Sequence, residues 1–160
     1  MKFGGLIAFV LIGLTLLVGI GCGGGGGGGS TSGGGTGGLD GKSRIRGSVL
    51  IDGTVLPIAN VEVQIFDLAG IIQGAGVTDA LGKYQIDVPQ TATTIFLKRS
   101  SVNTGTFYGS FYYKNDSFQL SIATCKAKLP ALAADTAYDL TAIEIPLRSD
   151  PPPPPPSGCN

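Results

Sequence analysis

Few side chains in this sequence are suited to chemistry. The chain holds three cysteines, Cys22, Cys125 and Cys159, and no histidine. Without histidine, the commonest general base and the usual partner of a nucleophilic serine or cysteine are missing. The cysteines do not have the spacing of a zinc site, and the acidic residues are scattered singly at turns and strand ends. These features favour a protein that is not an enzyme and holds no metal or cofactor.

Cys22 stands at a sharp change in composition. It follows an apolar run over residues 3–20, and it precedes seven consecutive glycines at 23–29. This arrangement resembles the signal peptide of a bacterial lipoprotein, in which the cysteine becomes the lipidated first residue of the mature chain. The resemblance implies a signal peptide over 1–21 and a membrane partner reached through lipid on Cys22. It departs from the usual motif at Gly19, where leucine is preferred.

Two other interpretations of the leader stay open. The apolar run is close to the length of about 18 residues that a membrane-spanning helix needs, so an uncleaved anchor is one of them. A secretory peptide cut without lipidation is the other, because residues 19–21 are small enough for ordinary cleavage. Lipidation accounts for the odd number of cysteines, since it leaves Cys125 and Cys159 as a pair in a compartment where disulfides persist.

The remainder of the chain divides by composition into three parts. Residues 22–42 form the anchor and a glycine-rich linker, whose composition predicts a flexible coil. Residues 43–148 are one domain's worth of sequence, and residues 149–160 form a proline-rich tail that carries Cys159. Positive and negative charges balance at 11 each. A neutral chain of this kind gives no basic surface for nucleic acid, so no nucleic-acid partner is expected.

The domain sequence predicts an all-β fold. Apolar residues alternate with polar ones over 45–51, 61–65 and 84–88, which is typical of half-buried strands separated by glycine-containing turns. Further strands are expected at 94–98, 106–113, 118–124 and 138–147, whereas 129–137 favours a loop or single turn. Seven or eight short strands at regular spacing indicate an antiparallel two-sheet sandwich rather than a closed barrel.

Residues 45–97 carry a family resemblance. They contain Ile-Arg-Gly-Ser-Val, then Leu-Pro-Ile-Ala-Asn-Val-Glu-Val-Gln-Ile, then Val-Thr-Asp-Ala-Leu-Gly-Lys-Tyr-Gln-Ile-Asp-Val-Pro. This pattern resembles the carboxypeptidase regulatory-like domain, a sandwich of the transthyretin (prealbumin) type, over about a third of the chain. Members of that family are mostly non-catalytic attachments to enzymes, receptors and surface proteins. The resemblance therefore implies a structural or binding role.

Asp79 and Gly82 lie in the most specific part of this pattern. Asp79 is expected to accept hydrogen bonds from backbone amides two or three residues ahead, and Gly82 to take a positive φ, before Tyr84 returns to the core. A calcium site that joins Asp79 to Asp52 or Asp67 is the alternative. Calcium needs six or more oxygen ligands, and the sequence contains no compact acidic loop. A structural turn is therefore the favoured interpretation.

The aromatic stretch at residues 107–113 is the candidate recognition surface. If Phe107 and Phe111 point inward, strand alternation turns Tyr108 and Tyr112 outward on one face. Exposed tyrosines stack on sugar rings or anchor a protein partner. Aromatic residues also favour strands and pair across them for stability alone, so both interpretations remain.

The tail suggests a covalent clamp. Prolines 151–156 predict a stiff polyproline II segment. If the strands at 118–124 and 138–147 are antiparallel neighbours, the tail is long enough to return along the sandwich and bring Cys159 to Cys125. We therefore expect a disulfide between these two cysteines, with the tail shielding a sheet edge.

Together these observations favour a lipid-anchored, non-catalytic domain of the cell envelope, at the outer membrane or cell surface, with a structural or protein-binding role. A carbohydrate-binding module that uses the Tyr108 and Tyr112 face is the alternative. The expected partners are thus the membrane, through the lipid on Cys22, and an envelope protein or a polysaccharide.

Overall fold

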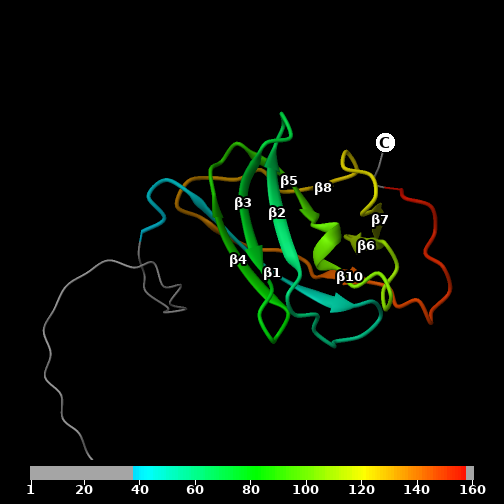
Figure 1. Cartoon of the computed structure of the whole chain (residues 1–160). Coiled ribbons are helices and arrows are strands. Elements are labelled where there is room, and N and C mark those ends of the chain that lie inside the picture. The colour runs from blue at the N-terminus through cyan, green and yellow to red at the C-terminus, as the bar shows by residue number, and fades with distance from the viewer. Residues whose placement is uncertain (1–37, 158–160) are drawn as a thin grey trace, which may run out of the picture. The chain divides into compact units, whose positions relative to one another are not determined.

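Residues 38–157 of the chain are described by a computed structural model, which is a two-layer β-sandwich (Figure 1). The described residues contain no α-helix and one short 3₁₀ turn, η1 (Arg99–Ser101). The strands are β1 (Ser43–Ile51), β2 (Glu62–Asp67), β3 (Ile72–Val77), β4 (Lys83–Val88), β5 (Ala92–Leu97), β6 (Ser110–Tyr113), β7 (Asp116–Gln119), β8 (Ala127–Lys128), β9 (Ala137–Asp139) and β10 (Ile143–Ile145). The predicted all-β sandwich is confirmed.

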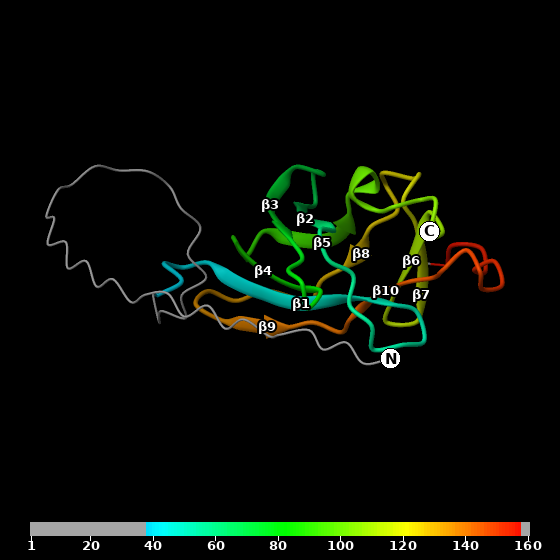
Figure 2. The same ribbon diagram turned by 60° about the horizontal axis from the view of Figure 1, so that its bottom comes forward.

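The first sheet is built around β1. Its strand order is β4-β1-β10-β6-β7, and β9 also pairs with β1. Along one side β1 pairs antiparallel with β4, and along the other it pairs in parallel first with β9 and then with β10. Figure 2 shows β9 and β10 following one another beside β1. This sheet is therefore mixed, because β1 runs parallel to β9 and β10 but antiparallel to β4.

The second sheet has the order β3-β2-β5-β8, and all its pairs are antiparallel. Strands of both sheets alternate between buried and exposed side chains, most regularly in β4, as expected for strands with one face on a core. Burial of the inward faces drives the two sheets together, at roughly 25 cal/mol per Å² of apolar area.

The core lies between the sheets. Phe111 is fully buried, stacks on Phe118 with ring centroids 5.1 Å apart, and meets the ring of Phe96 edge-on at 5.9 Å. The remaining fully buried side chains are mostly β-branched, as is usual for sheet interiors. They include Ile45, Val49, Val63, Ile65, Val88, Ile95, Ile143 and Ile145.

Two glycines let the sheets approach closely at one side. A β-carbon on Gly74 of β3 would lie 2.8 Å from side-chain carbons of Ile86 and Val88 in β4. A β-carbon on Gly76 would lie 2.9 Å from Ile86. Since real β-carbons are not found at such distances, β3 can cross β4 here only with glycine at both positions.

Several strand predictions were wrong in detail. Residues 38–157 contain ten strands rather than seven or eight, because β3 and β8 were not predicted and the segment 138–147 divides into β9 and β10. The segment 118–124 is mostly not strand. β7 ends at Gln119, and the chain then turns with hydrogen bonds from Ile122 N to Gln119 O and from Cys125 N to Ile122 O.

The disulfide prediction depended on the condition that the strands at 118–124 and 138–147 are antiparallel neighbours, and this condition is not met. β7 does not pair with the last strand, since β6 lies between β7 and β10. β6 and β7 form a hairpin whose two turn residues, Lys114 and Asn115, have φ values of 52° and 69°. Positive φ at both turn residues matches the right-handed twist of a hairpin.

The tail lies along β7, which is an edge strand of the first sheet. Ser117 N donates a hydrogen bond to Ser157 Oγ at 3.1 Å, and Ser117 Oγ donates to Pro154 O at 3.3 Å. Ser157 Oγ in turn donates to the Asp116 carboxylate at 3.3 Å. These contacts satisfy a backbone N–H that an edge strand would otherwise leave open to another chain.

The predicted signal peptide, the lipidation site Cys22, most of the linker, and Cys159 lie outside the described residues. Within residues 38–157, no helix has the length and hydropathy needed to cross a membrane.

Candidate functional site

A depression of about 380 Å³ surrounds Tyr112 at the β6 end of the first sheet. Tyr112 in β6 pairs across the sheet with Glu144 in β10, so strand register alone places their side chains together. Asp52 enters from the turn that follows β1, because β1 and β10 run side by side and end at the same level. The rest of the lining comes from the β6–β7 turn and the segment before β10, namely Tyr113, Lys114, Asn115, Thr141 and Ala142.

The depression is polar and slightly acidic. Partial burial raises the pKa of Tyr112, and the negative charge of Asp52 raises it further. Within the described part of the chain, neither Asp52 nor Glu144 takes part in an ion pair. A phenol ring thus lies in a depression whose lining residues also carry two carboxylates, one ammonium, an amide and a hydroxyl. This set can stack on a flat ligand face and exchange hydrogen bonds with ligand hydroxyl groups.

Tyr108 does not share this depression. The continuous strand expected from residue 106 is shorter, since β6 begins at Ser110. The Tyr108 hydroxyl donates a hydrogen bond to Asp150 O at 3.0 Å, and the Arg148 guanidinium lies 5.9 Å from the ring centroid. The structure therefore places Tyr112 in a candidate site and Tyr108 against the start of the tail.

Asp79 and Gly82 form a tight turn between β3 and β4. Asp79 Oδ1 accepts hydrogen bonds from Leu81 N at 2.8 Å and Lys83 N at 2.9 Å, two and four residues ahead. Gly82 has a φ of +69°, and a β-carbon there would lie 2.6 Å from Val49 O. Both residues thus stabilise the turn itself, since Asp79 accepts its backbone hydrogen bonds and Gly82 adopts its positive φ.

The turn borders a second hollow, of about 480 Å³, which carries both signs of charge. Asp79 and Lys83 line it together with Arg46 and Asp139, whose charged groups are 4.0 Å apart. Tyr84 also lines this hollow, and its hydroxyl has no hydrogen-bond partner within residues 38–157. Burial raises the pKa of Tyr84, so it stays protonated at physiological pH.

The acidic side chains of residues 38–157 do not form a metal site. The Asp67 carboxylate accepts hydrogen bonds from Ile71 N at 2.9 Å and from the Gln73 side-chain amide at 2.7 Å. No three acidic or cysteine side chains among residues 38–157 come close enough together to hold a metal ion. The alternative calcium site, joining Asp79 to Asp52 or Asp67, is therefore not assembled in this part of the chain.

Cys125 is 1% exposed and lies in the turn after β7. It is disulfide-bonded in the structure, and its partner lies outside the described residues. The pairing with Cys159 stays a prediction. Ser157, two residues before Cys159, lies beside Lys126 in the lining of one hollow, so the tail reaches the neighbourhood of Cys125.

Sequence reasoning found Tyr112 but missed its neighbours. Asp52, Asn115 and Glu144 are far apart in the chain, and only the pairing of β1 with β10 and of β10 with β6 brings them together. One local signal was available, since Asn115 and Asp116 follow an apolar run and are residue types that favour turns.

Comparisons with known proteins add little. No protein-family model matches the chain, and no curated protein matches it. Among solved structures the chain is similar to a 9R-lipoxygenase from Cyanothece PCC8801, with a TM-score of 0.43 and 16% sequence identity over 74% of this chain. The similar region is 19% of the lipoxygenase chain. This likeness carries no argument about activity, and the resemblance to the carboxypeptidase regulatory-like domain stays a prediction.

Proposed function

We propose that this chain is a lipid-anchored, non-catalytic domain of the cell envelope that binds a protein partner. The anchor is supported by the position of Cys22 between the apolar leader and the glycine-rich linker. The resemblance of residues 45–97 to a family of mostly non-catalytic domains supports the non-catalytic role. The proposal places the domain at the outer membrane or cell surface.

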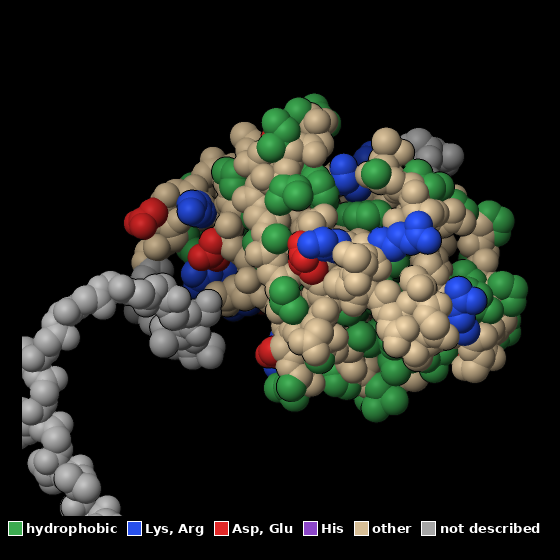
Figure 3. Space-filling model, in the orientation of Figure 1, with side chains coloured by type: hydrophobic (Ala, Val, Ile, Leu, Met, Phe, Trp, Pro, Cys, Tyr) green, Lys and Arg blue, Asp and Glu red, His purple; other side chains and the backbone are tan. Residues whose placement is uncertain are grey.

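One observation carries the protein-binding role. Val55, Leu56 and Leu81 are 87%, 57% and 63% exposed on two loops at one end of the sandwich. These loops touch, since a β-carbon on Gly82 would lie 2.9 Å from Pro57 Cβ. Figure 3 shows hydrophobic side chains along the lower edge, where the loops after β1 and before β4 lie. Exposed apolar side chains gathered in this way are typical of interaction sites.

The anchor is tested in a bacterial host with the full chain and a Cys22→Ser variant. Cells are fed an alkyne-bearing fatty acid, and the membrane fraction is analysed by intact mass. We expect the unaltered chain to be labelled and to start at residue 22, and the variant to carry no label. An unlabelled chain of full length in the membrane would instead support an uncleaved anchor, and an unlabelled product in the medium would support ordinary secretion.

The binding role is tested by chemical crosslinking in intact cells. A Val55→Ser/Leu56→Ser variant should lose a discrete crosslinked product that the unaltered chain gives. The matched control is Leu68→Ser/Ile71→Ser, because these side chains are 92% and 61% exposed on the separate β2–β3 turn. Loss of the product in both variants, or in neither, would contradict a partner at the Val55 end.

Carbohydrate binding is the second candidate function, and the Tyr112 depression supports it. An aromatic ring flanked by Asp52, Asn115 and Glu144 offers a sugar both a stacking face and hydrogen-bonding groups. On a glycan array, Tyr112→Ala should weaken retention about tenfold or more, which is the loss of one good contact. Tyr108→Ala is the control, because Tyr108 lies outside the depression. An array without retained glycans would end this candidate.

A further inference from the structure

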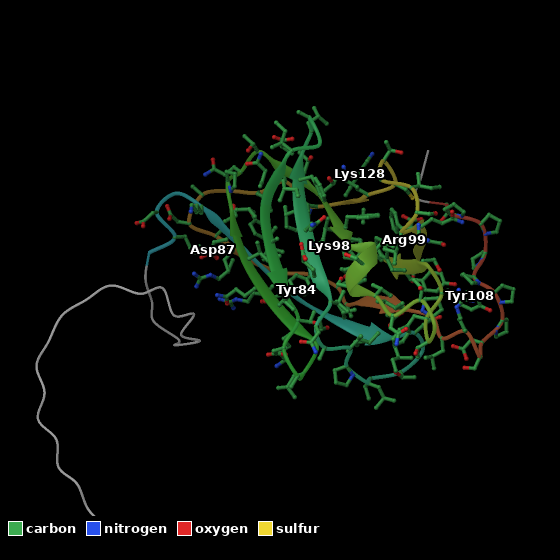
Figure 4. All side chains as sticks on the ribbon, viewed as in Figure 1. Tyr84, Asp87, Lys98, Arg99, Tyr108 and Lys128 are labelled. Atoms are coloured by element: carbon green, nitrogen blue, oxygen red, sulfur yellow. The ribbon has the colours of Figure 1, made fainter. Side chains whose placement is uncertain are left out.

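Positive charge gathers on one part of the molecular surface. Figure 3 shows Lys and Arg side chains across the right half of the face in view, while those at the left lie among most of the Asp and Glu side chains of that face. Figure 4 locates Lys98, Arg99 and Lys128 in this region. We call the set formed by Lys98, Arg99, Lys114, Lys126 and Lys128 the basic band.

Most of this charge is not neutralised by the protein. Lys98 is paired with Glu62 at 2.7 Å, but within residues 38–157 the other four cations of the band form no ion pair. Lys126 is held by an aromatic ring instead, with its ammonium 4.0 Å from the centroid of Phe66. A cation fixed over a ring keeps its full charge for an outside ligand.

A depression of about 380 Å³ lies within the band. Lys114, Lys126 and Lys128 line it together with a single carboxylate, that of Asp116. Ser157 lines it too, and its hydroxyl donates to Asp116 at 3.3 Å. Three lysines thus line one hollow that holds a single carboxylate, and lysine ammonium groups attract a tetrahedral oxyanion such as a phosphate group.

The arrangement favours a polymer over a single small anion. Lys128 lies on β8, which pairs with β5, and Lys98 and Arg99 follow β5 directly. Cations thus continue beyond the depression along the same face (Figure 4). The aromatic lining, Tyr113 and Phe118, is only 2% and 4% exposed, so the depression offers no stacking surface for nucleic-acid bases.

We propose that the basic band is a binding site for a phosphate-bearing polyanion, with one phosphate group seated among Lys114, Lys126 and Lys128. This inference does not depend on the proposed lipid anchor. It adds a ligand class to the protein partner and the carbohydrate considered above, and the hollow of the basic band shares Lys114 with the lining of the Tyr112 depression.

The test uses the full chain in a neutral detergent and a fluorescent linear polyphosphate as probe, with binding followed by anisotropy. We expect binding at low ionic strength that weakens as salt screens the exposed charges. Lys126→Gln/Lys128→Gln should weaken it at least about tenfold. Lys42→Gln/Lys83→Gln removes the same number of positive charges, but from positions outside the band, and should weaken binding less than about twofold. Matching circular dichroism spectra would show that both variants fold.

Each other outcome overturns the proposal. Equal losses in the two variants would mean that only net charge matters, and no salt-sensitive binding would mean that the band is solvated surface. Inorganic phosphate that competes as well as polyphosphate, at equal phosphate concentration, would reduce the site to a single-anion site. Tighter binding of a single-stranded oligonucleotide of equal charge would assign the band to nucleic acid.

Discussion

Replacing Gly47 by alanine should destabilise the sandwich, because Tyr84 lies where the new methyl group would be. The two residues are opposite each other in the β1–β4 pair. A β-carbon on Gly47 would clash with the Tyr84 hydroxyl and would lie 2.6 Å from Tyr84 Cζ and 3.0 Å from Cε1. Tyr84 is 4% exposed, so most of its ring packs against the protein, and the ring can yield only toward the hollow that it lines together with Gly47.

The expected size follows from two opposing effects. Overpacking of a core costs about 1–3 kcal/mol, whereas Gly→Ala lowers the entropy of the unfolded chain and stabilises by about 0.4–1 kcal/mol. We therefore expect Gly47→Ala to lower the free energy of unfolding by about 1–2 kcal/mol. In a Tyr84→Leu background the clash is gone, and the same substitution should be neutral or slightly stabilising. The coupling between the two sites should be near 2 kcal/mol.

Urea unfolding followed by far-UV circular dichroism measures all four members of this cycle. Gly109→Ala is the control, because a β-carbon there meets no atom within 4 Å. It should change the free energy of unfolding by less than about 0.5 kcal/mol, as surface substitutions usually do. An unchanged stability for Gly47→Ala, or an equal loss in both Tyr84 backgrounds, would refute the packing argument.

Three further predictions concern the turn, the tail and acid stability. Asp79→Ala should cost about 1–2 kcal/mol in urea unfolding, since two backbone amides lose their acceptor, and Asp79→Asn should retain most of the stability. Peptide mapping without reduction should find Cys125 joined to Cys159, a loop worth roughly 4 kcal/mol in the chain-entropy model; Cys125 joined elsewhere would contradict the clamp. The Arg44 guanidinium, hydrogen-bonded to Asp87 at 2.7 Å, lowers the pKa of that carboxyl. The stabilisation that the Arg44–Asp87 pair contributes is therefore present above about pH 4 and lost below it. Asp87→Asn should accordingly reduce the fall in the free energy of unfolding as the pH is lowered through this range.

The sequence revealed the strands in which one face is buried and the other is wet. β1, β2 and β4 follow that alternation, and each was predicted close to its observed bounds. β3 escaped notice because Gly74 and Gly76 interrupt its apolar pattern, and the reason for those glycines lies in a strand of the other sheet. β8 has only two residues, which is too short for any periodic signal.

The candidate site was predictable only in its central residue. Tyr112 stood out as an aromatic in a strand, but its pairing with Glu144 depends on which strand lies beside β6. The disulfide prediction depended on an order in which the strand at 118–124 adjoins the last one, and that order would have separated these two residues. A local alternation pattern carries no information on strand order, so the neighbours of Tyr112 required the structure.

The parallel pairing of β1 with β10 has a mechanical consequence. These are the first and last strands of the fold, joined in register from Val49–Ile143 to Ile51–Ile145. A pull applied to the segment before β1 and to the segment after β10 draws the two strands in opposite directions along their length. Their hydrogen bonds then share the load and must rupture together, instead of unzipping one by one, so the domain is built to resist tension between its two ends.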